Sequence, residues 1–251
     1  MGGSSVEQDR DGTRRSFECS TGMIDPPAAA AAWAALEQPW QLAFELAWEA
    51  FQAGSVPVGA VVVDPGGDLV TQGRSRSNEP TGPSGQLAGT YLAHAEVNAL
   101  AGLAPGDYWS HVLYTTLEPC LLCTAALTHA HVGAVRYAAS DPLWAGIERL
   151  PRLNQHIAGR WPDRQGPLSG PLAGWGGLLP LIWSLARAAD GPVARAYEQT
   201  APPLLQLARV LVGSGEIVAL RQLPLAQALH QIWPRLLTLQ RHVGRKADHQ
   251  H

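Results

Sequence analysis

Charged residues are scarce in this chain of 251 residues, at 16% of the sequence, and lysine occurs only once. The formal net charge is -3 and the isoelectric point is near 6.3. A protein that binds nucleic acid over a broad surface is generally basic. The composition therefore argues against a nucleic-acid partner, although it leaves room for a local basic patch.

The chain also lacks a long apolar run. Spanning a bilayer takes about 20 consecutive apolar residues, and no segment approaches that length. The first 30 residues are polar and acidic, where a secretory signal peptide would contain an apolar stretch. We therefore expect a cytoplasmic protein without a membrane partner.

Cysteine is rare as well, with three residues in the whole chain, two of them only three positions apart. This number and spacing suit a reducing compartment and a metal site better than a disulfide framework. Cys19 stands apart from Cys120 and Cys123, and we interpret it as an incidental thiol.

Hydrophobic residues make up 46% of the chain, and their pattern divides it into three parts. Residues 1–38 form a charged leader that contains Gly and Ser and ends in an alanine run, for which we predict disorder and a short helix. Residues 39–150 alternate between helical and strand-like patterns, which predicts a layered α/β domain. Residues 151–251 combine a Pro/Gly/Trp-rich connection with helical segments, which predicts a helical extension.

Hydrophobic periodicity also predicts the individual elements. A nearly continuous β-branched run is followed by Asp64-Pro65-Gly66-Gly67, which indicates a hairpin with one buried strand. The predicted strands cover 58–63, 69–72, 111–115 and 133–138, and the predicted helices cover 39–54, 91–103, 119–130, 178–189, 201–212 and 223–241, with 159–177 as an irregular connection.

Two short segments carry the residues for chemistry, His-Ala-Glu at 94–96 and Pro-Cys-Leu-Leu-Cys at 119–123. Cys120 and Cys123 are three positions apart, so on a helix their sulfurs share one face. With His94 they offer three ligands for a tetrahedral zinc ion and leave the fourth position for water, which is typical of catalytic zinc. Both groups lie at predicted helix N-termini, where the dipole favours thiolate.

Glu96 lies two residues after His94 and is not itself predicted to be a ligand. Zinc lowers the pKa of bound water from about 16 to about 7, which provides a nucleophile at neutral pH. Attack on an amino-substituted ring carbon then requires proton transfer, which Glu96 can perform. A structural zinc site is the alternative interpretation, but such a site needs a fourth protein ligand and none is evident at short spacing.

The combination of H-x-E with P-C-x-x-C occurs in zinc deaminases. Together with PVGAVVV, HAEVNAL, YTTLEPCLLC and HVGAVRYAASDP, it resembles the cytidine/deoxycytidylate deaminase superfamily over about residues 40 to 145. The segments are most similar to the branch that contains guanine deaminases and tRNA adenosine deaminases. The resemblance implies a three-layer α/β/α sandwich around a five-stranded mixed sheet, a zinc ion at the ends of two neighbouring helices, and a homodimer.

The resemblance implies roles in substrate binding for Asn78, Ala60, the amide of Ala95 and Asp141. Asn78 could equally be a turn residue, and Ser-Asp-Pro around Asp141 is also a common turn or cap sequence. Sixteen positions separate Asn78 from His94, more than is usual in the family. This insertion and the segment after Asp141 both flank the expected pocket mouth, which suggests a lid.

The leading hypothesis is a zinc-dependent hydrolytic deaminase that releases ammonia from a small aminated ring of the cytosine, guanine or triazine type. A tRNA adenosine deaminase is the alternative, but it needs a basic groove, and the strongest cationic cluster lies at 235–246, remote in sequence from the zinc motifs. A catalytically silent module that keeps zinc for stability is a third hypothesis. The intact Glu96 argues against it.

Overall fold

A five-stranded mixed sheet forms the centre of the computed structural model, which describes residues 27–247. The strands are β1 (Gly59–Val63), β2 (Leu69–Arg74), β3 (Val112–Thr115), β4 (Ala134–Tyr137) and β5 (Asp163–Gln165). They lie in the order β2-β1-β3-β4-β5. Strand β1 is antiparallel to β2 and β3, whereas β3, β4 and β5 are parallel. The mixed sheet expected from the resemblance is confirmed.

Alternate residues of β1 belong to two different apolar clusters. Val61 and Val63 pack into a cluster with residues of α2 (Gln38–Gln52), whereas Ala60 and Val62 pack into a second cluster with residues of α3 (Ala95–Leu100) and α4 (Leu121–His129). All five residues of β1 are buried, because helices cover both faces of the sheet. The predicted three-layer arrangement is therefore confirmed.

Helix α4 is the crossover that joins the parallel strands β3 and β4, as the geometry of parallel pairing requires. Helix α3 packs against β2 at Gly73, where a Cβ atom would lie 2.6 Å from the carbonyl oxygen of Ala95. Glycine therefore permits this close approach of strand and helix. The two helices lie side by side on the same face of the sheet, so their N-termini can contribute to one site.

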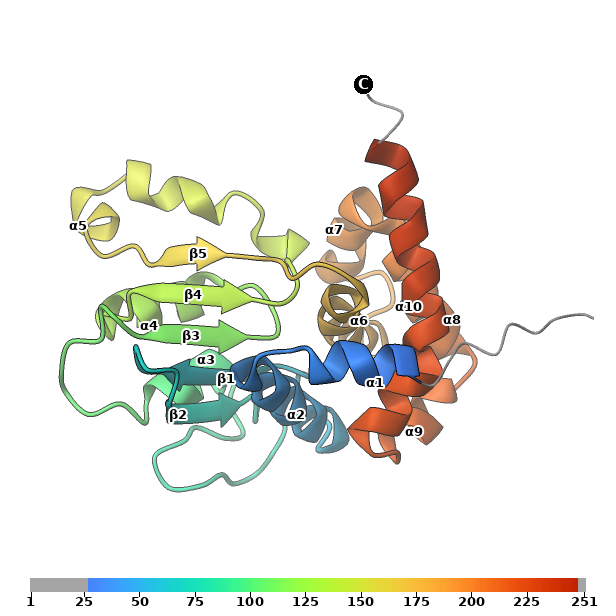
Figure 1. Cartoon of the computed structure of the whole chain (residues 1–251), viewed down its shortest axis with the longest axis horizontal. Coiled ribbons are helices and arrows are strands. Elements are labelled where there is room, and N and C mark those ends of the chain that lie inside the picture. The colour runs from blue at the N-terminus through green and yellow to red at the C-terminus, as the bar shows by residue number, and fades with distance from the viewer. Residues whose placement is uncertain (1–26, 248–251) are drawn as a thin grey trace, which may run out of the picture.

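The last third of the chain forms helices that gather beside the sheet, drawn from gold through orange to red in Figure 1. These helices are α6 (Pro171–Leu185), α7 (Pro192–Thr200), α8 (Pro202–Gly213), α9 (Glu216–Arg221) and α10 (Leu225–Ala247). Trp48 of α2 stacks on Trp175 of α6 with ring centroids 5.6 Å apart, and its indole N–H donates to the Leu223 carbonyl at 3.1 Å. The apolar core is thus continuous across residue 150.

The expected short alanine-rich helix is present as α1 (Pro27–Ala34), whereas the predicted disorder of the leader and Cys19 lie outside the described residues. The predicted helix over 91–103 is wrong in length. Only α3 is helical there, because His94 has an extended backbone with φ -75° and ψ 154°. None of the helices within 27–247 is long and apolar enough to cross a membrane.

The predicted irregular connection over 159–177 is also wrong, because it contains β5 and the first part of α6. Pro171 starts α6 at a position where proline is favoured. The glycines that suggested a loop instead allow close packing: a Cβ atom at Gly176 would lie 2.7 Å from the Thr116 carbonyl oxygen. Between β4 and β5 lie two short 3₁₀ helices, η1 (Pro142–Trp144) and η2 (Ile147–Arg152), and α5 (Gln155–Ala158).

Candidate active site

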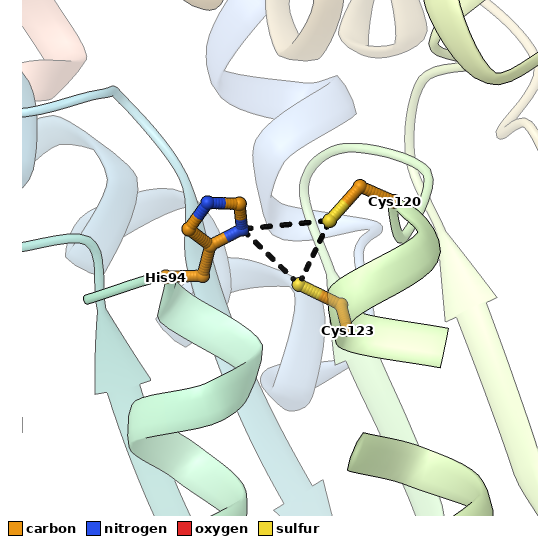
Figure 2. A group of neighbouring side chains, drawn as sticks. All are labelled: His94, Cys120 and Cys123. Atoms are coloured by element: carbon orange, nitrogen blue, oxygen red, sulfur yellow. Dashed lines mark hydrogen bonds between the residues drawn. The ribbon is translucent and has the colours of Figure 1, made fainter. Parts of the chain in front are cut away.

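His94, Cys120 and Cys123 meet at the N-termini of α3 and α4 (Figure 2). His94 and Cys120 are the N-cap residues of their helices, and Cys123 lies in the first turn of α4. The imidazole Nδ1 lies 3.3 Å from the Cys123 sulfur and 3.6 Å from the Cys120 sulfur, and the two sulfurs are 3.5 Å apart. The predicted position of both ligand segments at helix N-termini is confirmed.

The His94 nitrogen and the two cysteine sulfurs form a triangle that fits one face of a tetrahedral metal site. Zinc lies about 2.3 Å from thiolate sulfur and about 2.0 to 2.1 Å from histidine nitrogen. At tetrahedral angles those bond lengths place ligand atoms about 3.5 to 3.8 Å from one another, close to the three distances found here. One nitrogen and two sulfurs also match the ligand preference of zinc. The three side chains can therefore hold a zinc ion with one position left over.

The two cysteines differ in their electrostatic environment. Hydrogen bonding with Cys123, and then with His94, lowers the pKa of the Cys120 thiol to about 4. Interaction with Cys120 and burial raise the pKa of Cys123 well above its ordinary value. Hydrogen bonding with Cys120 raises the pKa of His94. Cys120 is therefore a thiolate at neutral pH, which is the form that binds metal.

Glu96 extends from the first turn of α3 toward the same place. Its carboxylate accepts a hydrogen bond from the Thr115 hydroxyl at 2.9 Å and one from the Cys123 thiol at 3.2 Å. The residue is only 4% exposed, and this burial raises the pKa of its carboxyl group. A carboxylate so placed is next to the candidate metal ligands without being one of the three.

A cavity of about 270 Å³ opens onto these groups. Six of the residues predicted from the sequence line it: His94, Ala95, Glu96, Cys120, Cys123 and Asp141. Apolar side chains supply much of the remaining wall, among them Val58, Leu117 and Trp144. The cavity is slightly smaller than the usual range for ligand sites, which begins at about 300 Å³, and it combines a candidate metal centre, a buried carboxylate and apolar walls.

Comparison with known proteins agrees with this geometry. Residues 35–139 match the family model described as the cytidine and deoxycytidylate deaminase zinc-binding region. Over 127 residues the chain is 30% identical to the tRNA-specific adenosine deaminase of Aquifex aeolicus, an alignment that covers 47% of this chain and 78% of that relative. The chain belongs to the cytidine and deoxycytidylate deaminase family.

The chain is also similar to parts of other proteins. It is 35% identical over 109 residues to the tRNA-specific adenosine deaminase of Haemophilus influenzae, covering 42% of this chain and 58% of the relative. It is 34% identical over 167 residues to the tRNA(Ile)-lysidine synthase of Deinococcus radiodurans, covering 64% of this chain and 27% of the relative. The solved guanine deaminase from Nitrosomonas europaea is 24% identical, with a TM-score of 0.44 over 59% of this chain and 85% of that one.

Two residues that the family resemblance assigned to substrate binding do not line the cavity of this deaminase-family chain. Asn78 donates through its side-chain amide to the Gly54 carbonyl at 3.0 Å, and its backbone N–H donates to the Ser55 hydroxyl at 3.2 Å. It therefore fastens the loop to the end of α2. Ala60 is fully buried within β1, where it packs in the apolar cluster beneath α3.

The insertion before His94 is fastened to α3 rather than placed over the cavity. Asn98 accepts from the Leu87 N–H at 2.8 Å and donates to the carbonyls of Leu87 and Arg74 at 3.1 and 3.0 Å. None of residues 79–93 lines the cavity. The segment after Asp141 does line it, through Leu143 and Trp144, so only one of the two segments expected at the mouth is there.

Sequence reasoning missed Thr115, Ser75 and the role of Glu118. Thr115 is fully buried at the end of β3, and its contact with Glu96 of α3 depends on how that helix packs against the sheet, which the motif alone does not give. Ser75 lines the cavity as the residue after β2. Glu118 lines it too, and accepts a hydrogen bond from the Asp141 N–H at 3.1 Å.

Proposed function

We propose that this chain is a zinc-dependent hydrolytic deaminase of a small nucleobase or nucleobase-like aminated ring, of the cytosine, guanine or triazine type. The observation that carries the proposal is the position of Glu96, a buried carboxylate beside His94, Cys120 and Cys123 in one cavity. A structural metal site has no use for such a carboxylate, so the arrangement supports catalysis over a silent zinc-stabilised module.

His94, Cys120 and Cys123 would hold the zinc ion. Zinc bound there supplies Lewis-acid activation of water at neutral pH. The remaining chemistry is proton transfer by Glu96, which takes a proton from the attacking water and delivers it to a ring nitrogen. A second proton passes through the same carboxylate to the departing amine. Water and the aminated ring thus give the keto ring and ammonia.

Thr115 and the cavity walls would orient these partners. The Thr115 hydroxyl holds one carboxylate oxygen of Glu96 at 2.9 Å, which fixes the direction of proton transfer. The Ala95 backbone and the Asp141 carboxylate offer a donor and an acceptor for the edge of a ring, and Trp144 offers a flat apolar surface. Positioning of this kind lowers the barrier by holding the reacting groups in place.

A tRNA adenosine deaminase is the second candidate, and two observations favour it. The relatives from Aquifex aeolicus and Haemophilus influenzae are tRNA-specific adenosine deaminases. Arg149 lines a hollow that shares Leu143 and Trp144 with the cavity, and Arg160 lines a second hollow that borders the first one at Leu121 and Leu150. The small cavity itself favours the free ring.

Ammonia release from a panel of substrates tests both candidates. The panel contains cytosine, guanine, adenine, their nucleosides, aminated triazines and an anticodon-loop RNA, all at one salt concentration because RNA binding depends on salt. We expect a free ring to be preferred, and preference for the RNA would establish the second candidate. Glu96→Gln is the matched control: it should keep zinc and fold but lose about 100-fold or more in kcat. Absence of ammonia release from every substrate by the zinc-loaded wild type would refute the proposal.

A further inference from the structure

Arg164 has a nearly buried charged side chain that contacts a residue of the cavity wall, although it lies beyond the region that matches the family model. Its side chain is 3% exposed. The central carbon of the guanidinium lies over the rings of Tyr137 and Trp161, 5.8 and 5.7 Å from their centroids. Such a cation is costly to bury unless its donors are used, and three of its nitrogens have partners.

Of those partners, Glu118 lines the cavity, and Thr124 is next to the cavity-lining residue Cys123. The Nη2 atom donates to Glu118 at 3.1 Å, and the Nη1 atom donates to the Thr124 hydroxyl at 3.1 Å. Thr124 directly follows Cys123, and its hydroxyl donates to the Pro119 carbonyl at 3.3 Å. The third partner, Glu148, accepts from Nε at 2.8 Å but is 54% exposed and lies outside the cavity.

The Glu118 carboxylate connects Arg164 to Asp141 by hydrogen bonds. One of its carboxylate oxygens accepts from Arg164, and the other accepts from the Asp141 N–H at 3.1 Å. Asp141 in turn caps η1 by accepting from the Leu143 N–H at 3.0 Å. A guanidinium has a fixed planar fork, so it can set the position of Glu118 and Thr124 relative to each other.

We propose that Arg164 is a positioning residue of the active site, which holds Asp141 in the cavity wall through Glu118 and holds the first turn of α4 through Thr124. This inference rests on the proposed function, because it assigns Asp141 a place beside the substrate ring. The ammonium group of lysine is a point charge and lacks the fork. Arg164→Lys therefore keeps the charge and breaks the geometry.

The test compares three variants as zinc-loaded full chains. Arg164→Lys should lower kcat/KM about tenfold or more. Glu118→Gln keeps the volume, but its amide group turns a donor toward either Arg164 or the Asp141 N–H, so it should lower kcat/KM to a similar extent. Glu148→Gln is the matched control, because it removes the exposed partner of the same guanidinium, and it should stay within about twofold of wild type. The double variant Arg164→Lys/Glu118→Gln should be no worse than the more damaged single variant, since both break one network.

Exchange of the Asp141 amide hydrogen supplies a readout that does not depend on activity. It should be at least about tenfold faster in Arg164→Lys, because the acceptor Glu118 is no longer held in place. A kcat/KM within about twofold of wild type in both Arg164→Lys and Glu118→Gln, or an unchanged Asp141 exchange rate, would overturn the inference. If the wild type deaminates no ring, the proposed function fails, and the exchange rate still decides whether Arg164 positions Asp141.

Discussion

Replacing Thr115 by valine isolates the hydrogen bond that orients Glu96. Valine has nearly the shape of threonine but carries a methyl group where the hydroxyl donates to the Glu96 carboxylate at 2.9 Å. The site is fully buried, so water cannot replace the lost donor. The Cys123 thiol also donates to Glu96, at 3.2 Å, but it would lose its proton on binding zinc and so cannot compensate in the zinc-loaded protein.

The expected size of the effect follows from the charge of the acceptor. Hydrogen bonds to charged groups contribute about 1.5 to 3 kcal/mol. If this energy serves to hold the carboxylate in its reactive position, its loss lowers kcat by about tenfold to about 150-fold. The measurement is the steady-state rate of ammonia release by zinc-loaded protein, with zinc content determined on the same sample.

Thr115→Ser is the matched control. It keeps the hydroxyl and removes a buried methyl group, so it should cost about 0.5 to 1.5 kcal/mol in the free energy of unfolding while kcat stays within about threefold of wild type. The two variants should therefore separate activity from stability. A Thr115→Val protein whose kcat lies within twofold of wild type would refute the orienting role.

Three further changes test the metal centre and its supports. Cys123→Ala should lower bound zinc from about one per chain to a small fraction, because one of three ligands is lost; metal analysis that finds full occupancy would contradict the ligand assignment. Gly73→Ala should lower the free energy of unfolding, measured in urea, by about 1 to 3 kcal/mol, because the new Cβ atom would lie 2.6 Å from the Ala95 carbonyl oxygen. An unchanged midpoint of urea unfolding would argue against that close approach. Asn98→Ala removes all three hydrogen bonds that the Asn98 side chain makes to Leu87 and Arg74. A protease should therefore cleave within residues 79–93 faster than in the wild type. Equal cleavage rates would show that other contacts hold the insertion.

The cluster of candidate zinc ligands was predictable because its geometry is largely local. Cys120 and Cys123 lie at the start of one helix, and His94 and Glu96 lie at the start of another. The spacing within each pair therefore indicates that its two side chains are near each other. Strand β1 was predictable for a similar reason, since a continuous β-branched run is typical of a strand buried on both faces. Only the family resemblance indicated that the two ligand segments meet.

Elements defined by distant contacts were not predictable. Strand β5 consists of Asp-Arg-Gln with two of its three residues exposed, so it has no apolar alternation to reveal it. Its strand character comes from pairing with β4. The contact of Arg164 with Glu118 joins residues 46 positions apart, and nothing in either local sequence indicates it. The turn chemistry of Asn78 matched a family position, but the hydrogen bond to Gly54 determines where the side chain lies.

The two edges of the sheet have different protection against pairing with another chain. Strand β5 closes one edge with only three residues, two of them charged, which is a common way to prevent edge-to-edge aggregation. Strand β2 forms the other edge with Leu69 and Val70 exposed. A shortened chain that ended before residue 163 would replace the charged edge with β4, whose backbone groups would then be open to intermolecular pairing. Any minimal version of this chain intended to remain monodisperse must therefore retain β5.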